Sequence, residues 1–271
     1  MKIGNSDFNF QKRTYYMGIL NMTPDSFSDG GLYNEEEKAV AHSMLLEKEG
    51  ADILDIGCES TRPGFTVVEE AEEIKRLTGS LKKILKSVSI PISIDTYKGK
   101  VAEKALELGA HMINDITGLW HDPYLSKVVA YYGVPICIMV NRRLIKSSGD
   151  VFKDIAIFLK KSFSIIKKAG IKEEQIIIDP GIGFGYSIDE NFKILGALEK
   201  MKERYPYPIL LGTSRKGMIW KTLNIKPKDS VNGTLATTAI GILKGANIIR
   251  VHDIRENREC GIIADCIRKL Q

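Results

Sequence analysis

The chain has 271 residues, 44% of them hydrophobic, with a net charge of +5 and a sequence pI near 8.8. This length can bury one large core, and barrels of about 250 residues fold as single domains. We find no signal-peptide core, membrane-length apolar run, linker or low-complexity tract, so we expect one cytoplasmic domain of residues 1–271 with no membrane segment. The lysines are spread over expected helix faces and no DNA- or RNA-binding module is recognisable, which argues against a nucleic-acid partner.

Short apolar stretches alternate with amphipathic stretches along the whole chain. The expected helices include residues 34–49, 69–86, 99–108 and 150–168. The eight expected strands are YYMGIL from Tyr15, ADILDIG from Ala51, PISID from Pro91, HMIND from His111, PICIMV from Pro135, QIIID from Gln175, PILLG from Pro208 and NIIRVHD from Asn247. Buried strands that alternate with helices predict an α/β fold with a parallel sheet, and eight repeats predict a single closed (β/α)8 barrel of the TIM type.

Polar residues follow each expected strand, at the end where barrel enzymes form their active sites. The loop after the first strand, NMTPDSFSDGG, offers the amide of Asn21 as an oxygen ligand, although its Pro and Gly residues also fit a simple turn. Arg62, Lys216, Arg250 and His252 stand at other strand ends. Fixed cations grouped around an oxygen ligand suit a bulky anion such as pyrophosphate.

Two carboxylates end apolar strands, where an ionised group is costly to bury without hydrogen-bond donors. Asp95 and Asp179 could accept the adjacent N–H donors of a flat heterocycle, such as the 2-amino-4-oxo edge of a pterin. Asn114 adds a donor and acceptor pair, and Phe184 and Met139 offer apolar surface for the ring. These residues predict a pterin-like ligand at the barrel mouth.

Ordinary structural explanations remain open for several of these features. Asp95 and Asp179 also fit helix N-caps, or ion partners of Lys216 and Arg250. The DPGIGFG segment lacks the third glycine and the acidic residue of a dinucleotide fingerprint, so we interpret it as a tight turn. The four cysteines lack zinc-type spacing and are expected to be reduced, structural thiols.

Seven segments, one at almost every strand end and in the same order, resemble the dihydropteroate synthase family. They are NMTPDSFSDGG (21–31), GCESTRPG (57–64), SIDT (93–96), INDITG (113–118), DPGIGFG (179–185), GTSRK (212–216) and RVHD (250–253). The resemblance implies a transferase of folate biosynthesis and a sulfonamide target. It would condense 6-hydroxymethyl-7,8-dihydropterin pyrophosphate with 4-aminobenzoate, giving 7,8-dihydropteroate and pyrophosphate with the help of Mg²⁺.

The resemblance also implies roles for individual residues. By position, Asn21 is similar to the magnesium ligand, and the pyrophosphate group is implied to be held by Thr61, Arg250 and His252. The pterin-binding set is implied to be Asp95, Asn114, Asp179 and Lys216, with Met139, Phe184 and Gly212 lining the substrate site. The part that folds over the aminobenzoate is implied to be Phe27, Arg62 and Pro63, with Gly217 close to its carboxylate. The family also implies a homodimer.

Three positions depart from the family pattern. Val140 stands where a His commonly follows the Met, and Tyr186 stands where a Lys commonly follows DPGIGFG. Gly217 replaces a frequent Ser, which removes one hydroxyl but leaves the backbone N–H groups. These departures bear on the second substrate and on the response to sulfonamides more than on the pterin site.

Two alternative functions stay open at this point. A methyltetrahydrofolate corrinoid methyltransferase shares a pterin-binding barrel, but it handles no pyrophosphate and would not need NMTPDSFSDGG or STRPG. A pterin-binding protein without catalysis is favoured only by the three departures.

Overall fold

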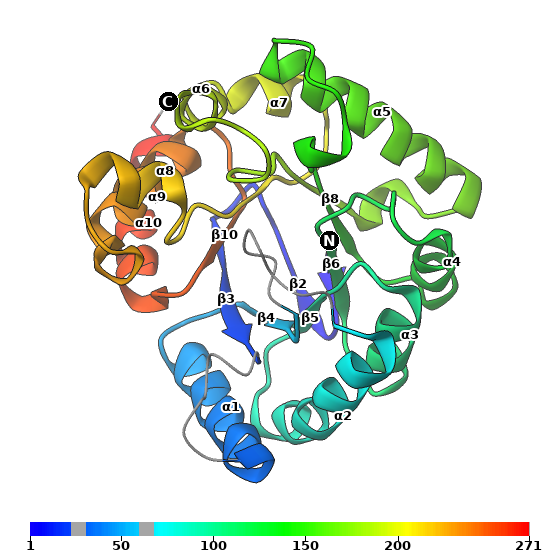
Figure 1. The fold of residues 1–271 in the computed structure, drawn as a ribbon. Helices are drawn as coiled ribbons and strands as arrows, with labels where there is room; N and C mark the ends of the chain where they lie inside the picture. Colours follow the sequence, from blue (N-terminus) through cyan, green and yellow to red (C-terminus); the bar gives the residue numbers. More distant parts are fainter. Residues whose placement is uncertain (23–30, 60–67, 271) are drawn as a thin grey trace.

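The computed structural model describes residues 1–22, 31–59 and 68–270, with residues 31–35 described through their backbone alone. Eight parallel strands form one sheet in the order β8-β7-β6-β5-β4-β3-β10-β9. Their bounds are β3 (Tyr15–Asn21), β4 (Ile53–Gly57), β5 (Ile92–Asp95), β6 (Met112–Asp115), β7 (Ile136–Met139), β8 (Ile176–Asp179), β9 (Leu210–Leu211) and β10 (Ile248–Val251). A parallel bridge between Ile178 and Ile209 joins the two ends of the sheet, which confirms the predicted (β/α)8 barrel (Figure 1).

The helices form a ring around the strands (Figure 1). They are α1 (Gly31–Lys48), α2 (Glu70–Ser87), α3 (Gly99–Glu107), α4 (Pro123–Tyr132), α5 (Val151–Ala169), α6 (Ile188–Gly196), α7 (Glu199–Arg204), α8 (Gly217–Leu223), α9 (Val231–Leu243) and α10 (Ile254–Arg268). Short 3-10 helices lie at η2 (Arg142–Leu144), η3 (Glu173–Gln175) and η4 (Pro227–Asp229). The four helices expected from the sequence are present close to their expected bounds. No helix in the described ranges is both long and apolar enough to cross a membrane.

Local sequence signals explain where several helices begin and end. The Asp122 carboxylate accepts a hydrogen bond from Tyr124 N at the start of α4, and Asp150 caps α5 in the same way. Ser187 and Glu190 form a reciprocal capping box at the start of α6. Gly133, with φ of 67°, ends α4 in the left-handed conformation that glycine adopts at low cost.

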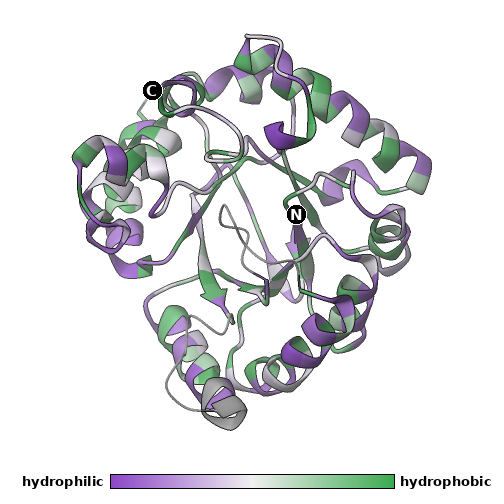
Figure 2. Cartoon of the chain, viewed as in Figure 1, coloured by the Kyte–Doolittle hydropathy of each residue, from purple (hydrophilic) through white to green (hydrophobic). Residues whose placement is uncertain are grey.

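The apolar core has two parts, separated by the strands. Side chains on the outer face of the sheet pack against the helices, and Figure 2 shows both hydrophobic and hydrophilic residues along helices such as α2 and α5. Inward-facing side chains fill the lower barrel, among them Met17, Ile53 and Met112. Ile3 and Phe8 pack into the same inner cluster from a short antiparallel hairpin, β1 (Lys2–Ile3) and β2 (Ser6–Asp7), which the sequence patterns did not predict.

The pleat of the strands sets where polar side chains lie. Successive side chains of a strand point to opposite faces, so every second residue points into the barrel. In β4 the outward residues Leu54 and Ile56 belong to the outer core, whereas Ile53 belongs to the inner cluster. Asp55 and Gly57 therefore follow Ile53 on the inner face, toward the carboxyl ends of the strands.

Candidate functional site

A hydrogen-bonded group of charged side chains lies inside the upper barrel. Arg250 Nε donates to Asp55 Oδ2 at 2.6 Å, and Arg250 Nη2 donates to Asp95 Oδ2 at 2.8 Å. Asn114 Nδ2 donates to the same Asp55 oxygen at 2.9 Å. β10, β4, β5 and β6 therefore contribute one side chain each to a single network, whose register is set by the parallel pairing of these strands.

A second group comes from β8 and the start of α8. Asp179 Oδ1 accepts a hydrogen bond from Gly181 N at 2.7 Å. Lys216 Nζ lies 4.3 Å from the centre of the Phe184 ring, which is itself buried. A Cβ at Gly183 would lie 3.1 Å from Lys216 Cδ, and its φ is +83°, so this turn requires glycine for the approach of the lysine. DPGIGFG is thus a tight turn, as expected.

Burial shifts the pKa values of these groups toward neutrality. It raises the pKa of Asp95 to about 7, against the opposing effect of Arg250, and raises the pKa of Asp179 to about 6. Burial and the neighbouring Arg250 lower the pKa of Lys216 to about 8. For Arg250 itself, the carboxylates Asp55 and Asp95 outweigh burial and raise its pKa. Shifted pKa values gathered in one buried group of side chains are typical of a functional site.

Two glycines lie between these charged groups, and a Cβ at either would be at ordinary contact distance from them. A Cβ at Gly57 would lie 3.7 Å from Asn21 Oδ1 and 3.8 Å from Asp95 Oδ2. A Cβ at Gly212 would lie 3.9 Å from Arg250 Cβ and 4.0 Å from Asp179 Oδ2. The absent side chains keep the mouth between these groups clear, which suits a flat ligand.

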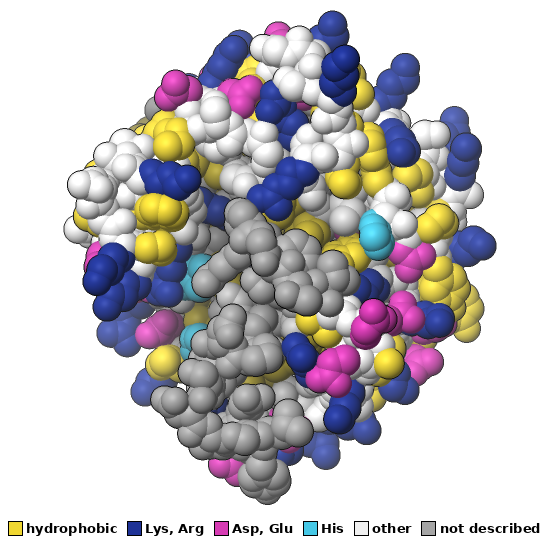
Figure 3. Space-filling view, in the orientation of Figure 1, with side chains coloured by type: hydrophobic (Ala, Val, Ile, Leu, Met, Phe, Trp, Pro, Cys, Tyr) yellow, Lys and Arg dark blue, Asp and Glu magenta, His cyan; other side chains and the backbone are white. Residues whose placement is uncertain are grey.

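The remaining expected residues of the described chain lie around the same end of the barrel. His252 Nδ1 is 2.9 Å from Ser214 Oγ, and Met139, paired with Asp179 in the sheet register, is buried. Gly217 is the first residue of α8, directly after Lys216. Phe27, Thr61, Arg62 and Pro63 lie outside the described residues. Figure 3 shows Lys and Arg side chains spread over this face of the molecule instead of gathered in one patch.

Neither buried carboxylate caps a helix, since the N-cap residues of α3 and α6 are Lys98 and Ser187. One ordinary interpretation does hold, because Asp95 is an ion partner of Arg250. Asp179 has no such pair among the described residues within hydrogen-bond reach and instead accepts from the turn that follows it.

Two of the three departures from the family pattern pack against other parts of the protein. Val140 is fully buried in the outer core, and its carbonyl oxygen would lie 1.8 Å from a Cβ at Gly181. The Tyr186 ring packs 5.4 Å from the guanidinium carbon of Arg142, and Arg142 is itself paired with Asp154. Both residues therefore support the turn around DPGIGFG.

The sequence interpretation missed Asp55 and Ser93. Asp55 is fully buried, and its Oδ1 has no hydrogen-bond partner among the described residues; the same is true of Ser93 Oγ. An acidic residue in the middle of the apolar strand ILDIG was the available signal, because a carboxylate is rarely placed in a buried strand without a partner.

The donor set at the mouth fits Mg²⁺ only in part. No group of three His, Cys, Asp or Glu side chains in the described ranges could hold a metal ion. The Asn21 amide at the end of β3 is a single oxygen donor, and its Oδ1 would lie 3.7 Å from a Cβ at Gly57. Mg²⁺ usually keeps several waters and is bound by one or two protein oxygens together with substrate phosphates, so this single donor suits an ion that arrives with a pyrophosphate.

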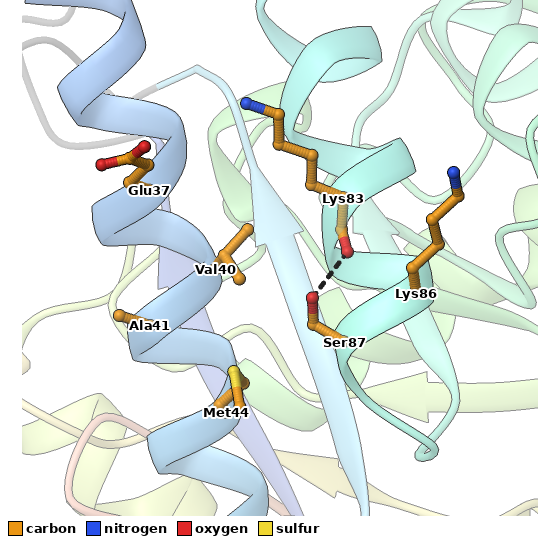
Figure 4. Close-up of a pocket in the computed structure, with 7 residues that line it drawn as sticks. All are labelled: Glu37, Val40, Ala41, Met44, Lys83, Lys86 and Ser87. Atoms are coloured by element: carbon orange, nitrogen blue, oxygen red, sulfur yellow. Dashed lines mark hydrogen bonds between the residues drawn. The ribbon is translucent and has the colours of Figure 1, made fainter.

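A separate pocket lies on the outside of the ring, between α1 and α2. It is lined by Glu37, Val40, Ala41, Met44, Lys83, Lys86 and Ser87, and Figure 4 shows Ser87 bonded to the backbone oxygen of Lys83. None of the residues expected at the functional site lines it. The barrel mouth therefore remains the candidate site.

Comparisons with known proteins agree with this geometry. A family model described as "Pterin binding enzyme" matches residues 17–252. Dihydropteroate synthase of Clostridium beijerinckii is 50% identical over 268 residues, covering 98% of this chain and 99% of the relative. Dihydropteroate synthase of Bacillus subtilis is 44% identical, covering 93% of this chain and 87% of the relative.

Solved structures show the same similarity in three dimensions. Dihydropteroate synthase of Clostridium difficile, crystallised in the presence of pteroic acid, has a TM-score of 0.93 and 46% identity, covering 96% of this chain and 99% of that chain. The Yersinia pestis enzyme in a sulfonamide drug complex has a TM-score of 0.91 and 34% identity, covering 100% of this chain and 99% of that chain. On its barrel, its mouth and these relatives, the chain belongs to the dihydropteroate synthase family of pterin-binding transferases.

Proposed function

We propose that the barrel mouth condenses 6-hydroxymethyl-7,8-dihydropterin pyrophosphate with 4-aminobenzoate. The observation that carries this assignment is the meeting of Asp95, Asn114 and Arg250 in one buried network, with Asp179 and Lys216 beside it. In the reaction, the amine nitrogen forms a bond to the pterin methylene carbon and loses a proton. The C–O bond to pyrophosphate breaks, and pyrophosphate leaves with the electron pair.

The pterin ring is assigned to the space beside Gly212, between Asp179 and Arg250. Asp179 and Asp95 would accept from the amino and ring N–H groups of the pterin, and the Asn114 amide matches a donor and acceptor pair. Lys216 would donate to a ring acceptor, while Phe184 and Met139 provide apolar surface. As pyrophosphate departs, the ionised carboxylates would stabilise the positive charge left on the pterin.

The leaving group is assigned to the cationic side of the mouth. Arg250 lies in β10 and His252 is the first residue after this strand, and Thr61 is assigned to the same group by family position. Asn21 would hold Mg²⁺ together with the pyrophosphate oxygens. When bound, the ion neutralises charge that builds on the leaving pyrophosphate.

The amine substrate is assigned to Arg62, Pro63 and Phe27, with Gly217 near its carboxylate. Binding beside the pterin places the amine for attack, so no nucleophilic side chain is required. Exclusion of water from the mouth protects the pterin cation from hydrolysis. We also assign sulfonamides to this subsite, since a solved relative was crystallised in a sulfonamide drug complex.

The domain organisation, location and oligomeric state are also proposed from the family resemblance. Residues 1–271 are proposed to act as one pterin-binding domain, as a cytoplasmic homodimer. Gel filtration with light scattering measures the dimer directly, and a monomer at micromolar concentration would contradict it.

Pyrophosphate release, measured with and without 4-aminobenzoate, tests the proposed reaction. The proposal expects release that depends on the pterin pyrophosphate and leads to dihydropteroate when the amine is present. A corrinoid methyltransferase would release no pyrophosphate, and a non-catalytic binding protein would bind the pterin without turnover. Either result with folded protein would overturn the proposal.

A further inference from the structure

Two consecutive arginines follow β7, in the short helix η2, and only the first of them forms ion pairs within the described chain. Arg142 Nε donates to Asp154 Oδ2 at 2.8 Å, and Arg142 Nη2 lies 3.2 Å from Glu190 Oε1. Arg142 Nη1 also donates to the backbone oxygen of Gly185 at 2.8 Å. Arg142 therefore joins η2 to α5 and α6, and its charge is offset within the fold.

The second arginine has no such partner. The side chain of Arg143 is exposed, and no carboxylate of the described residues is within ion-pair distance of it. Within the described chain, its side chain donates one hydrogen bond, from Nη2 to the backbone oxygen of Gly183, and at 3.4 Å this bond is long. A guanidinium group has five N–H donors, so most of those of Arg143 are left for water or a ligand.

The turn after β8 holds Arg143 beside the barrel mouth. The guanidinium carbon of Arg143 lies 5.1 Å from the centre of the Phe184 ring, and Lys216 Nζ lies 4.3 Å from the same centre. Arg142 N donates to the backbone oxygen of Phe184 at 3.1 Å, which fixes η2 against this turn. A Cβ at Gly185 would lie 2.9 Å from Arg143 N, so glycine permits the close approach. Arg143 and Lys216 therefore lie against one ring at the mouth.

These two cations influence each other. Burial lowers the pKa of Lys216 to about 8, and the positive charges of Arg250 and Arg143 lower it further. Asp179 and Asp95 act in the opposite direction. Arg143 thus adds positive charge to a part of the mouth that already holds Lys216, and an anion bound beside both cations would offset their repulsion.

The position of Arg143 separates it from the groups assigned to the first substrate. Asp179 and Asn114, which are assigned to the pterin, are buried, whereas Arg143 is exposed. In the closed sheet, β8 and β9 lie between β7 and β10, and the side chains assigned to the pyrophosphate come from the end of β10. The anionic group left for Arg143 is therefore the carboxylate of the second substrate.

We propose that Arg143 binds the carboxylate of 4-aminobenzoate and thereby favours this amine over uncharged analogues. The inference rests on the proposed function, which places that carboxylate near Gly217, the residue directly after Lys216. Gly217 has no side chain that could donate a hydrogen bond to it. A guanidinium group matches a carboxylate in both geometry and charge, so Arg143 supplies the donors that Gly217 lacks.

The test compares Arg143→Gln with Lys146→Gln, which removes an exposed cation three residues further along the same loop that has no ion pair in the described chain. Steady-state kinetics with each substrate varied give two Michaelis constants. For Arg143→Gln we expect the constant for 4-aminobenzoate to rise about tenfold and that for the pterin substrate to stay within about twofold. Arg143→Lys should recover part of the loss, and Lys146→Gln should match the parent.

The charge of the ligand gives a second readout, which a purely structural role would not separate from the first. Sulfanilamide keeps the aminophenyl ring of 4-aminobenzoate but has an uncharged sulfonamide in place of the carboxylate. Its inhibition constant should stay within about twofold of the parent in Arg143→Gln, because no charge-assisted hydrogen bond is lost. The Tm should also match the parent, since the substituted side chain is exposed.

Three results would overturn the inference: equal changes in the Michaelis constants of both substrates, equal weakening of 4-aminobenzoate and sulfanilamide, or no change in either. The first two would show that Arg143 only supports the turn after β8. Failure of the proposed function is distinguishable, because the parent protein itself would then form no dihydropteroate. A parent that turns over and an Arg143→Gln variant that matches it would contradict the role of Arg143 alone.

Discussion

Two buried groups of charged side chains lie near the same end of the barrel, and they differ in how completely they are hydrogen-bonded. Around Lys98, every carboxylate oxygen of Glu59 and Glu73 accepts a hydrogen bond. Around Arg250, Asp55 Oδ1 is buried without a partner in the described chain. Lys216 lies against the Phe184 ring, no carboxylate of the described residues is within ion-pair distance of it, and burial lowers its pKa to about 8.

In the first group the polar atoms are hydrogen-bonded within the protein. In the second group some polar atoms have no partner in the described chain, and we interpret them as atoms that a ligand would contact. A buried polar atom without a partner costs about 1–3 kcal/mol, so a chain retains such atoms where something else gains from them. In the proposed function, the donors and acceptors of the barrel mouth bind a pterin and a pyrophosphate. The cluster of Lys98, Glu59 and Glu73 has no carboxylate oxygen left for a ligand.

The largest effect is expected when the carboxylates of the mouth are neutralised. Asp95→Asn and Asp179→Asn each replace an acceptor-only group by an amide with a single acceptor oxygen. Because hydrogen bonds to charged groups contribute about 1.5–3 kcal/mol, we expect the affinity for the pterin pyrophosphate to fall on the order of 100-fold. Calorimetry on folded variants measures it.

Glu203→Gln is the matched control, since this exposed glutamate on α7 undergoes the same chemical change away from the mouth. It should bind the pterin substrate like the parent. If Asp95→Asn and Asp179→Asn also bind like the parent, the ring does not lie between these carboxylates.

A second comparison concerns the two halves of the first substrate. His252→Ala should weaken the pyrophosphate-bearing pterin at least about tenfold and leave the unphosphorylated hydroxymethyl pterin nearly unchanged, because a donor to an anionic group is lost. Arg250→Ala is a less selective probe, since it also leaves Asp55 and Asp95 without their partner. Fluorescence titration of the His252→Ala variant with each ligand measures the two affinities. If both affinities fall equally, His252 contacts the pterin ring and not the pyrophosphate.

The pKa shifts predict a bell-shaped pH profile for the pterin substrate. The raised pKa values of Asp95 and Asp179, about 7 and 6, mean that both carboxylates are ionised only above that range. The pterin kcat/KM should therefore rise on the order of tenfold as pH increases from 6 to 7.5. Above about 8 it should fall as Lys216 loses its proton.

Lys216→Arg removes the group responsible for the fall in kcat/KM above about pH 8, because arginine stays charged throughout this range. In this variant, kcat/KM for the pterin substrate should still rise between pH 6 and 7.5 but should no longer fall above pH 8. A profile that is flat from pH 5 to 9 in the parent would show that none of these groups changes protonation in the rate-determining range.

The barrel was predictable because each strand carries its own local signals. Apolar runs such as QIIID end in a polar residue, and the period of the strand then decides that Asp179 and Asn114 share the inner face. Asp55 escaped prediction because its partner Arg250 is 195 residues away and no local pattern links them. Only the closed sheet brings β4 and β10 onto either side of β3.

The cluster around Lys98 was hidden for a different reason. In the sequence, Glu73 and Lys98 look like ordinary charges of solvated helix surfaces, and Glu59 looks like part of a loop. Their burial depends on how α2 packs against the turn after β5, which is a tertiary property. Periodicity reports the faces of single elements, and it carries no information on contacts between them.

The smallest expected effect comes from Gly217, at the first position of α8. This glycine has no positive φ, and a Cβ would meet only Lys221 at ordinary contact distances of 3.7 and 3.9 Å, so serine fits without strain. If the position lies near the carboxylate of 4-aminobenzoate, Gly217→Ser should lower that Michaelis constant on the order of threefold. A typical hydrogen bond contributes about 0.5–1.5 kcal/mol, and the backbone N–H groups at the start of α8 already offer donors to the carboxylate. The constant for the pterin substrate should not change. Gly217→Ala is the matched control, because it adds the Cβ without the hydroxyl; if both variants shift the constant equally, backbone rigidity and not a hydrogen bond would be responsible.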